Sequence, residues 1–266
     1  MKTIACIAAA VCSLSGASAQ PLVASSFLNQ IVDVDPTTGA VSNVRNVNLP
    51  SGQFMTGISL GPSPSSYYTV GATQDGAARS TLYSVDRLTG AATPFAALGA
   101  RLVEGELRYN PIDRSFYASW ATDSRLLYRI NEGGNVSTIT LPSFLRDPSG
   151  LAFSSAGELY VLETSQSTSV PGRVVVIDLE SVTITREVVL DRTIGLLAGL
   201  EFVGEDLVVA DRTGAFYNVD ALNGATTLRF QASITDLSGI ALVPAPGAAG
   251  VALMMLATSS RRRRRI

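Results

Sequence analysis

Carboxylates and guanidinium groups are the charged side chains with which the body of this chain could do chemistry. The 266-residue sequence contains no histidine, its one lysine is Lys2, and its two cysteines are Cys6 and Cys12. A serine, threonine or tyrosine nucleophile in the body would therefore lack an activating histidine or lysine. Paired carboxylates of the glycosidase type, or a Ca²⁺ ion held by oxygen ligands, are the routes to catalysis that remain. Neither has a recognisable motif, so we predict no catalytic residue and no metal ligand, and we favour a protein that is not an enzyme.

Six charged residues are the candidates for a ligand-binding site. Two of them, Asp147 and Asp236, begin the equivalent segments DPSG and DLSG. Their carboxylates should therefore lie near each other at the mouth of a central channel. An aspartate in this place can also cap the turn into the strand that follows. The full set is Glu104, Arg108, Asp147, Asp191, Glu201 and Asp236.

Arg108 and Glu201 are singled out by their positions in an internal repeat. Five short apolar stretches recur at spacings of 40–49 residues, and they begin at Gly57, Glu106, Gly150, Gly199 and Gly239. Two residues past these starts stand Ser59, Arg108, Ala152, Glu201 and Ala241, with apolar residues on either side. Since strand side chains alternate between two faces, the two charges should point away from the apolar residues, into a central channel. A buried lone charge is costly, so we expect an Arg108–Glu201 pair, and we favour a structural over a ligand-binding role for it.

Each repeat contains four predicted strands. The repeat that begins at Gly150 continues with Leu159–Leu162, with Arg173–Asp178 and with Ile184–Val189. Four strands in every 40–49 residues are typical of propeller blades. The last repeat supplies only its first strand, and the N-terminal region supplies the other three, which closes the ring. We therefore predict an all-β fold, a five-bladed β-propeller over residues 20–243 with four-stranded blades, one of them shared by both ends of the chain. A β-sandwich is the competing architecture.

The turns after the third strands share a pattern, an aspartate followed four residues later by glycine, as in Asp35–Gly39, Asp86–Gly90 and Asp220–Gly224. An aspartate side chain accepts backbone N–H groups two residues on, whereas Ca²⁺ takes roughly 6–8 oxygen ligands. We therefore predict turns and no calcium loops. The blade-to-blade segments, such as Pro142–Ser149, and the segments between second and third strands should emerge at one face, called the loop face below.

Both ends of the chain have features of processing signals. Lys2 precedes the apolar run Ile4–Val11, and small residues at Ala17 and Ala19 suit a cleavage site, so residues 1–19 are a predicted signal peptide. Six of the 20 basic residues are Lys2 and Arg261–Arg265, whereas none of the 22 acidic residues lies in 1–19 or 244–266. The body therefore carries a net charge of about −8. This charge argues against a nucleic-acid partner.

The segment after Val243 has three parts: a Pro-x-Pro motif at Pro244, the apolar stretch Gly247–Thr258, and the cluster Arg261–Arg265. This layout resembles the bacterial PEP-CTERM sorting signal, with Ala245 where the usual motif has glutamate. The resemblance implies that residues 244–266 are a C-terminal sorting signal, that a membrane protease of the exosortase type is a partner, and that the tail contacts the membrane transiently. A plain tail anchor or a nucleic-acid-binding tail is the alternative.

The repeats also look like those of NHL-type extracytoplasmic propellers. With the tail, this resemblance leads us to expect an exported protein of the cell surface or extracellular matrix, which binds a polysaccharide or a surface protein through the loop face and uses no cofactor. Tyrosines and Trp120 in the second and third strands could form a sugar platform, although we favour packing between blades. The rival function is a Ca²⁺-dependent propeller hydrolase, similar to lactonases or phosphoesterases.

Overall fold

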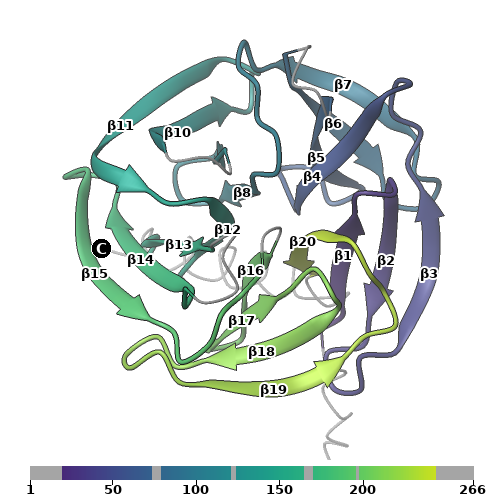
Figure 1. The fold of residues 1–266 in the computed structure, drawn as a ribbon. Helices are drawn as coiled ribbons and strands as arrows, with labels where there is room; N and C mark the ends of the chain where they lie inside the picture. Colours follow the sequence, from purple (N-terminus) through teal and green to yellow (C-terminus); the bar gives the residue numbers. More distant parts are fainter. Residues whose placement is uncertain (1–19, 74–78, 121–123, 165–169, 196–197, 244–266) are drawn as a thin grey trace, which may run out of the picture.

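The computed structural model describes residues 20–243 apart from 74–78, 121–123, 165–169 and 196–197. The predicted signal peptide, 1–19, and the predicted sorting tail, 244–266, lie outside the described residues. The described part of the chain forms 20 strands and no helix, so it holds no helix that could cross a membrane. Five four-stranded antiparallel sheets stand as blades around a common centre (Figure 1). The predicted five-bladed propeller is confirmed.

The blades are numbered one to five in the order of the predicted repeats, and each is given from its inner to its outer strand. Blade one is β4 (Gln53–Ser59), β5 (Ser66–Thr73), β6 (Thr81–Asp86) and β7 (Ala92–Ala97), and blade two is β8 (Leu107–Asn110), β9 (Ser115–Ala118), β10 (Ser124–Asn131) and β11 (Val136–Leu145). Blade three is β12 (Pro148–Phe153), β13 (Leu159–Glu163), β14 (Arg173–Asp178) and β15 (Thr183–Val189). Blade four is β16 (Gly199–Val203), β17 (Asp206–Ala210), β18 (Ala215–Val219) and β19 (Thr226–Gln231), and blade five is β20 (Leu237–Leu242), β1 (Leu22–Ser26), β2 (Gln30–Val34) and β3 (Val41–Asn46).

Blade five joins the two ends of the described chain. Its inner strand, β20, pairs antiparallel with β1, with Leu22 opposite Leu242 and Val23 opposite Ala241. The inner strand of every other blade is followed directly in sequence by its second strand. Closure of the ring therefore depends on pairing between the first and the last strand, as the sequence predicts.

The hydrophobic core lies in layers between neighbouring blades. In the layer between blades four and five, Val32 and Val34 of β2 share a buried cluster with Phe216 and Phe230, whose ring centroids are 4.6 Å apart. Each large apolar side chain buried in this way contributes about 1.5–3 kcal/mol. The tyrosines considered for a sugar platform are largely in these layers, since four of them are at most 6 % exposed: Tyr67, Tyr68, Tyr117 and Tyr160. Their packing role agrees with the favoured interpretation.

The turns between third and fourth strands are built around their aspartates. Asp35 Oδ1 accepts the backbone N–H groups of Thr37 and Thr38, each at 2.8 Å. Asp86 does the same for Leu88, at 3.0 Å, and Thr89, at 2.8 Å. The backbone N–H of Thr38 is the main reason why the pKa of Asp35 lies below its ordinary value. These contacts are those of the predicted turns, and no cluster of three metal-ligating side chains occurs within the described residues.

Candidate functional site

The centre of the ring is occupied by Arg108, which extends from β8 of blade two and is 5 % exposed. Its Nε donates to the carbonyl of Leu151 on β12, at 2.8 Å. Its Nη2 donates to the carbonyls of Leu200 and Ile240, both at 2.7 Å. Its Nη1 forms an ion pair with Glu201 Oε2 at 2.6 Å. One side chain therefore connects the inner strands of blades two, three, four and five.

Glu201 extends this network to the backbone around it. Its Oε2 also accepts the N–H of Leu242, on β20, at 2.9 Å, and its Oε1 accepts that of Phe202 at 2.9 Å. The pair predicted from strand alternation is present, and its polar groups bond within the protein. A ligand-binding role for Arg108 and Glu201 stays a prediction.

Blade one is connected to this centre by a third charged residue, Glu106, which is 1 % exposed. Its Oε1 accepts the N–H of Ile58 on β4, at 3.1 Å, and that of Leu107, at 3.0 Å. Its Oε2 has no hydrogen-bond partner in the described part of the protein. Burial raises the pKa of Glu106 well above its ordinary value, and the nearby Arg108 guanidinium opposes this shift only in part.

Three of the acidic candidates lie shortly before inner strands: Glu104 lies three residues before that of blade two, and Asp147 and Asp236 directly precede those of blades three and five. Their φ angles are 62°, 38° and 56°, which is the left-handed region that few residues other than glycine adopt. Asp236 Oδ1 accepts from Arg212 Nε at 2.8 Å, and the Asp147 carbonyl accepts from the Thr164 N–H at 3.3 Å. The Asp236 side chain therefore pairs with a residue of blade four, and the Asp147 backbone bonds within blade three. A ligand-binding role for these residues stays a prediction.

The structure does not bring Asp191 together with Arg108. Asp191 accepts the N–H of Thr226 at 3.1 Å and its hydroxyl at 2.6 Å, and these bonds lower the pKa of Asp191. Thr226 begins β19, the outermost strand of blade four. At ~4.8 Å per strand, β19 lies about 14 Å from the inner strand of its sheet. Asp191 is therefore part of the rim of the ring, where successive blades meet.

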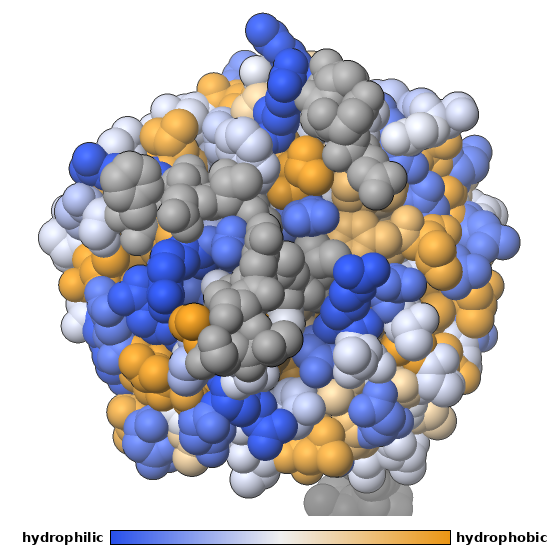
Figure 2. Space-filling model, viewed as in Figure 1, coloured by the Kyte–Doolittle hydropathy of each residue, from blue (hydrophilic) through white to orange (hydrophobic). Residues whose placement is uncertain are grey.

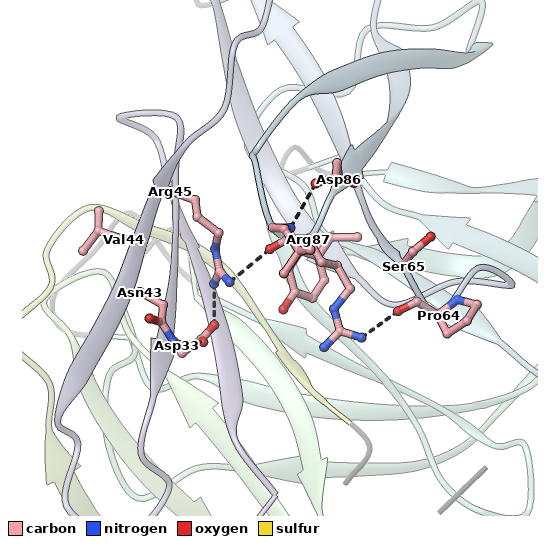
Figure 3. A pocket seen from close by; sticks show the side chains of 10 residues that line it. Asp33, Asn43, Val44, Arg45, Pro64, Ser65, Asp86 and Arg87 are labelled. Carbon is pink, nitrogen blue, oxygen red and sulfur yellow. Dashed lines mark hydrogen bonds and ion pairs between the residues drawn. The ribbon is translucent and has the colours of Figure 1, made fainter. Parts of the chain in front are cut away.

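A cleft at the junction of blades five and one was not predicted from the sequence. It has a volume of about 740 Å³ and separates β3 from two turns of blade one (Figure 3). Arg45 of β3 pairs with Asp33 and donates to the Arg87 carbonyl at 3.2 Å. The Arg87 side chain donates to the Pro64 carbonyl at 2.8 Å. The lining residues are Asp33, Asn43, Val44, Arg45, Pro64, Ser65, Tyr67, Asp86, Arg87 and Leu88.

The surface around the centre of the ring is polar. Figure 2 shows one face, on which groups of hydrophilic residues surround the centre and apolar residues are scattered between them. Such a surface suits a polar ligand better than an apolar one.

No family model and no curated protein sequence matches the chain. Solved structures do match it. A chain of the crystal structure of a nidogen/laminin complex shares 13% identity over 85% of this chain and 98% of its own length, with a TM-score of 0.51. The PQQ-bound aldose sugar dehydrogenase of Streptomyces coelicolor shares 15% over 84% and 82%, with a TM-score of 0.49, and the hydrazine synthase of Kuenenia stuttgartiensis shares 14% over 75% and 59%, with a TM-score of 0.46. At such identities, the similarity to the nidogen/laminin chain shows the fold alone. The chain has the body of a β-propeller.

Proposed function

We propose that this protein is an exported, surface- or matrix-associated propeller without catalytic activity, whose loop face binds a glycan or a protein. The observation that carries the proposal is the occupied centre of the ring. Arg108 donates four hydrogen bonds to three inner strands, and Glu201 accepts from two backbone N–H groups besides Arg108. Groups that are already bonded in this way hold the blades together. We therefore expect a ligand to bind at the surface and not at the centre.

The loop face supplies the groups for such a ligand. Glu104, Asp147 and Asp236 keep a left-handed backbone shortly before three inner strands. Non-glycine residues in this region cost of order 1–3 kcal/mol each, and they concentrate at ligand-binding segments. The Arg212–Asp236 pair is well exposed, with side chains 55% and 35% accessible. Carboxylates and guanidinium groups in alternation can accept and donate hydrogen bonds to sugar hydroxyls or to a polar peptide surface.

Export, and an exosortase-type protease as a partner, are proposed from the leader and the tail alone. The expected product is a protein that first contacts the membrane through residues 244–266 and then remains at the cell surface or in the matrix. Radiolabelling of the producing cells, followed by fractionation, tests this part. The expected result is a mature form shorter at both ends in the surface fraction, and an unprocessed form in the cytoplasm would contradict it.

The binding proposal is tested with the full-length protein passed over immobilised extracellular polysaccharide and over surface proteins of the producing cell. Asp147→Asn and Asp236→Asn are the test variants, and Glu158→Gln, an exposed residue in the turn between β12 and β13, is the matched control. Retention should fall in the two loop-face variants and not in the control. Equal retention of all three would overturn the loop face as the binding surface. Turnover of a lactone or phosphoester, together with thermal stabilisation by Ca²⁺, would favour the rival hydrolase instead.

A further inference from the structure

The cleft between blades five and one lies at the other end of the blades from the loop face. It is lined by the β4–β5 turn at Pro64 and Ser65 and by the β6–β7 turn at Asp86–Leu88. In an antiparallel sheet these two turns emerge at one end, and the β5–β6 segment of the loop face emerges at the other. Its volume, about 740 Å³, is within the range of ligand pockets, roughly 300–1,000 Å³. The cleft can therefore be tested apart from the loop face.

Arg45 has a structural role that repeats elsewhere in the ring. It pairs with Asp33 of its own blade and donates to the carbonyl of Arg87 in the next blade. Arg229 of blade four does the same, since its Nε donates to the carbonyl of Pro36 at 2.9 Å and its Nη1 lies 3.4 Å from Asp206 Oδ2. Both carbonyls belong to the residue directly after the turn aspartate. Arg45 is therefore accounted for as a clamp between neighbouring blades.

The contacts of Arg87, in contrast, do not explain why blade one carries an arginine at this position. The residues at the same place in the other four turns are Pro36, Glu132, Leu179 and Ala221, so blade one alone carries a cation there. Its guanidinium donates to the Pro64 carbonyl and lies 4.9 Å from the centroid of the buried Tyr67 ring. In the described part of the chain no carboxylate pairs with it. Because guanidinium has five N–H donors, Arg87 retains donors for a ligand in the cleft, at the position drawn in Figure 3.

The surroundings of Arg87 restrict what kind of anion it could bind. Two arginines and two aspartates line the cleft, so the site has no excess positive charge for a dianion such as phosphate. Asp33 and Asp86 can instead accept hydrogen bonds from hydroxyl groups. The rim is apolar, because Val44 is 59% and Leu88 87% exposed. A ligand that combines one negative charge, several hydroxyl donors and a partly apolar ring face matches all three features.

We propose that the Arg87 cleft binds a uronate residue of an acidic polysaccharide. The sugar carboxylate pairs with the free N–H groups of Arg87, which the Tyr67 ring and the Pro64 carbonyl hold in place. The sugar hydroxyls donate to Asp33 and Asp86. The C–H face of the ring contacts Val44 and Leu88. This second site goes beyond the loop-face binding proposed above and does not depend on it.

Titration calorimetry of the full-length protein with tetragalacturonic acid tests the proposal. Loss of a charge-assisted hydrogen bond should weaken binding by about tenfold to a hundredfold in Arg87→Gln. Leu88→Glu is a second variant. It places a carboxylate, with the same sign of charge as the uronate, at an exposed position and leaves the fold unaffected. The matched control is Arg186→Gln, which removes an arginine that lies 5.7 Å from the Tyr160 ring on blade three, outside the cleft. The fully methyl-esterified tetramer is the neutral probe.

The expected result is weaker binding by both cleft variants, wild-type binding by the control, and little binding of the methyl ester. Lack of binding by the wild type, unchanged affinity of both cleft variants, or equal binding of the methyl ester would each overturn the proposal. Displacement of the tetramer by equimolar inorganic phosphate would also overturn it, since the cleft would then be a general anion site. Weaker binding in Asp147→Asn and Asp236→Asn, with Arg87→Gln unchanged, would assign the uronate to the loop face, against this proposal and in favour of the preceding one.

Discussion

Arg108 on β8 and Glu201 on β16 meet at the centre of the ring, with 2.6 Å between Nη1 and Oε2 and with their side chains 6% and 13% exposed. The two residues come from blades that are not neighbours in the ring. Burying two charges is costly, and the attraction between them offsets this cost only when the remaining polar atoms are also bonded. The carbonyls of Leu151, Leu200 and Ile240 meet this condition for Arg108. The Arg108 side chain therefore meets the condition under which its ion pair with Glu201 offsets the cost of burial.

The first prediction concerns the loss of one member of this pair. Arg108→Met should lower the free energy of unfolding by about 3–5 kcal/mol, since it leaves the Glu201 charge without its partner. Replacing both, as Arg108→Met with Glu201→Leu, should recover part of the loss, because no lone charge remains. Urea denaturation of the single and double variants measures both effects.

The control for this prediction is an exposed pair. Arg114 and Glu132 also form an ion pair, but the Arg114 side chain is 72% exposed. Arg114→Met should therefore change stability by only about 0–1 kcal/mol. If Arg108→Met were as stable as Arg114→Met, the ring would not depend on its central arginine.

The second prediction concerns Glu106 and pH. Since burial raises its folded pKa, the folded protein holds this proton more tightly than the unfolded chain, in which a glutamate has a pKa of about 4.3. The resulting stability is complete below that value and is lost as pH rises through the raised folded pKa. Glutamine has no proton to lose, so Glu106→Gln should gain stability relative to the wild type as pH rises above about 4.3.

Urea denaturation of both proteins over a pH series measures this difference. Glu158→Gln, at an exposed position, controls for the loss of a negative charge as such. A stability difference between Glu106→Gln and the wild type that stays constant with pH would show that Glu106 titrates alike in the folded and unfolded states.

The fold could be predicted because its information is local and repeated. Each blade carries its own apolar first strand and its own turn residue, an aspartate in four blades and Asn131 in blade two. Arg108 and Glu201 stand out because they occupy a repeat position otherwise held by small residues. Strand alternation then suffices to place them in the channel. Element ends were harder to place, since the segment 142–149 was predicted as a loop, whereas β11 continues to Leu145 and β12 begins at Pro148.

The role of Glu106 was missed because it depends on neighbours from other blades. The other repeats have glycine at this position, and a Cβ on Gly57 or Gly239 would lie 2.4 or 2.8 Å from Glu106 Oε1. Glycines there leave room for the buried carboxylate, a relationship that appears only when the strands are side by side. The Arg87 cleft was missed for a similar reason, since twist brings Arg45 on the outer strand of one blade to a turn of the next.

The third prediction concerns the turn glycine at Gly224, which lies against the preceding blade. Its φ is +79°, and a Cβ there would lie 2.0 Å from the Val189 carbonyl oxygen. Gly204 has a similar φ of +67°, with nothing within 4 Å of its added Cβ. Gly204→Ala should therefore lower the free energy of unfolding only by the cost of a left-handed backbone at alanine, about 1–2 kcal/mol. Gly224→Ala should lower it by more. Thermal or urea unfolding of the two variants measures the difference, and equal losses would mean that the blade contact at Gly224 contributes nothing.

The fourth prediction concerns closure of the ring by β1 and β20. Val23 and Ala241 are opposite each other in this pair, and both are buried. A disulfide between Val23→Cys and Ala241→Cys would join the two ends of the propeller, so the chain that it closes in the unfolded state is nearly as long as the whole body. In the chain-entropy model a loop of this length gives about 5 kcal/mol of stabilisation.

The variant is made with Cys6 and Cys12 replaced by serine, and the same protein in its reduced form is the control, because it contains the same buried substitutions. The oxidised form should unfold at a clearly higher urea concentration than the reduced form. Equal midpoints would mean that the ends of the propeller stay together in the unfolded state or that β1 and β20 are not the strands that close it.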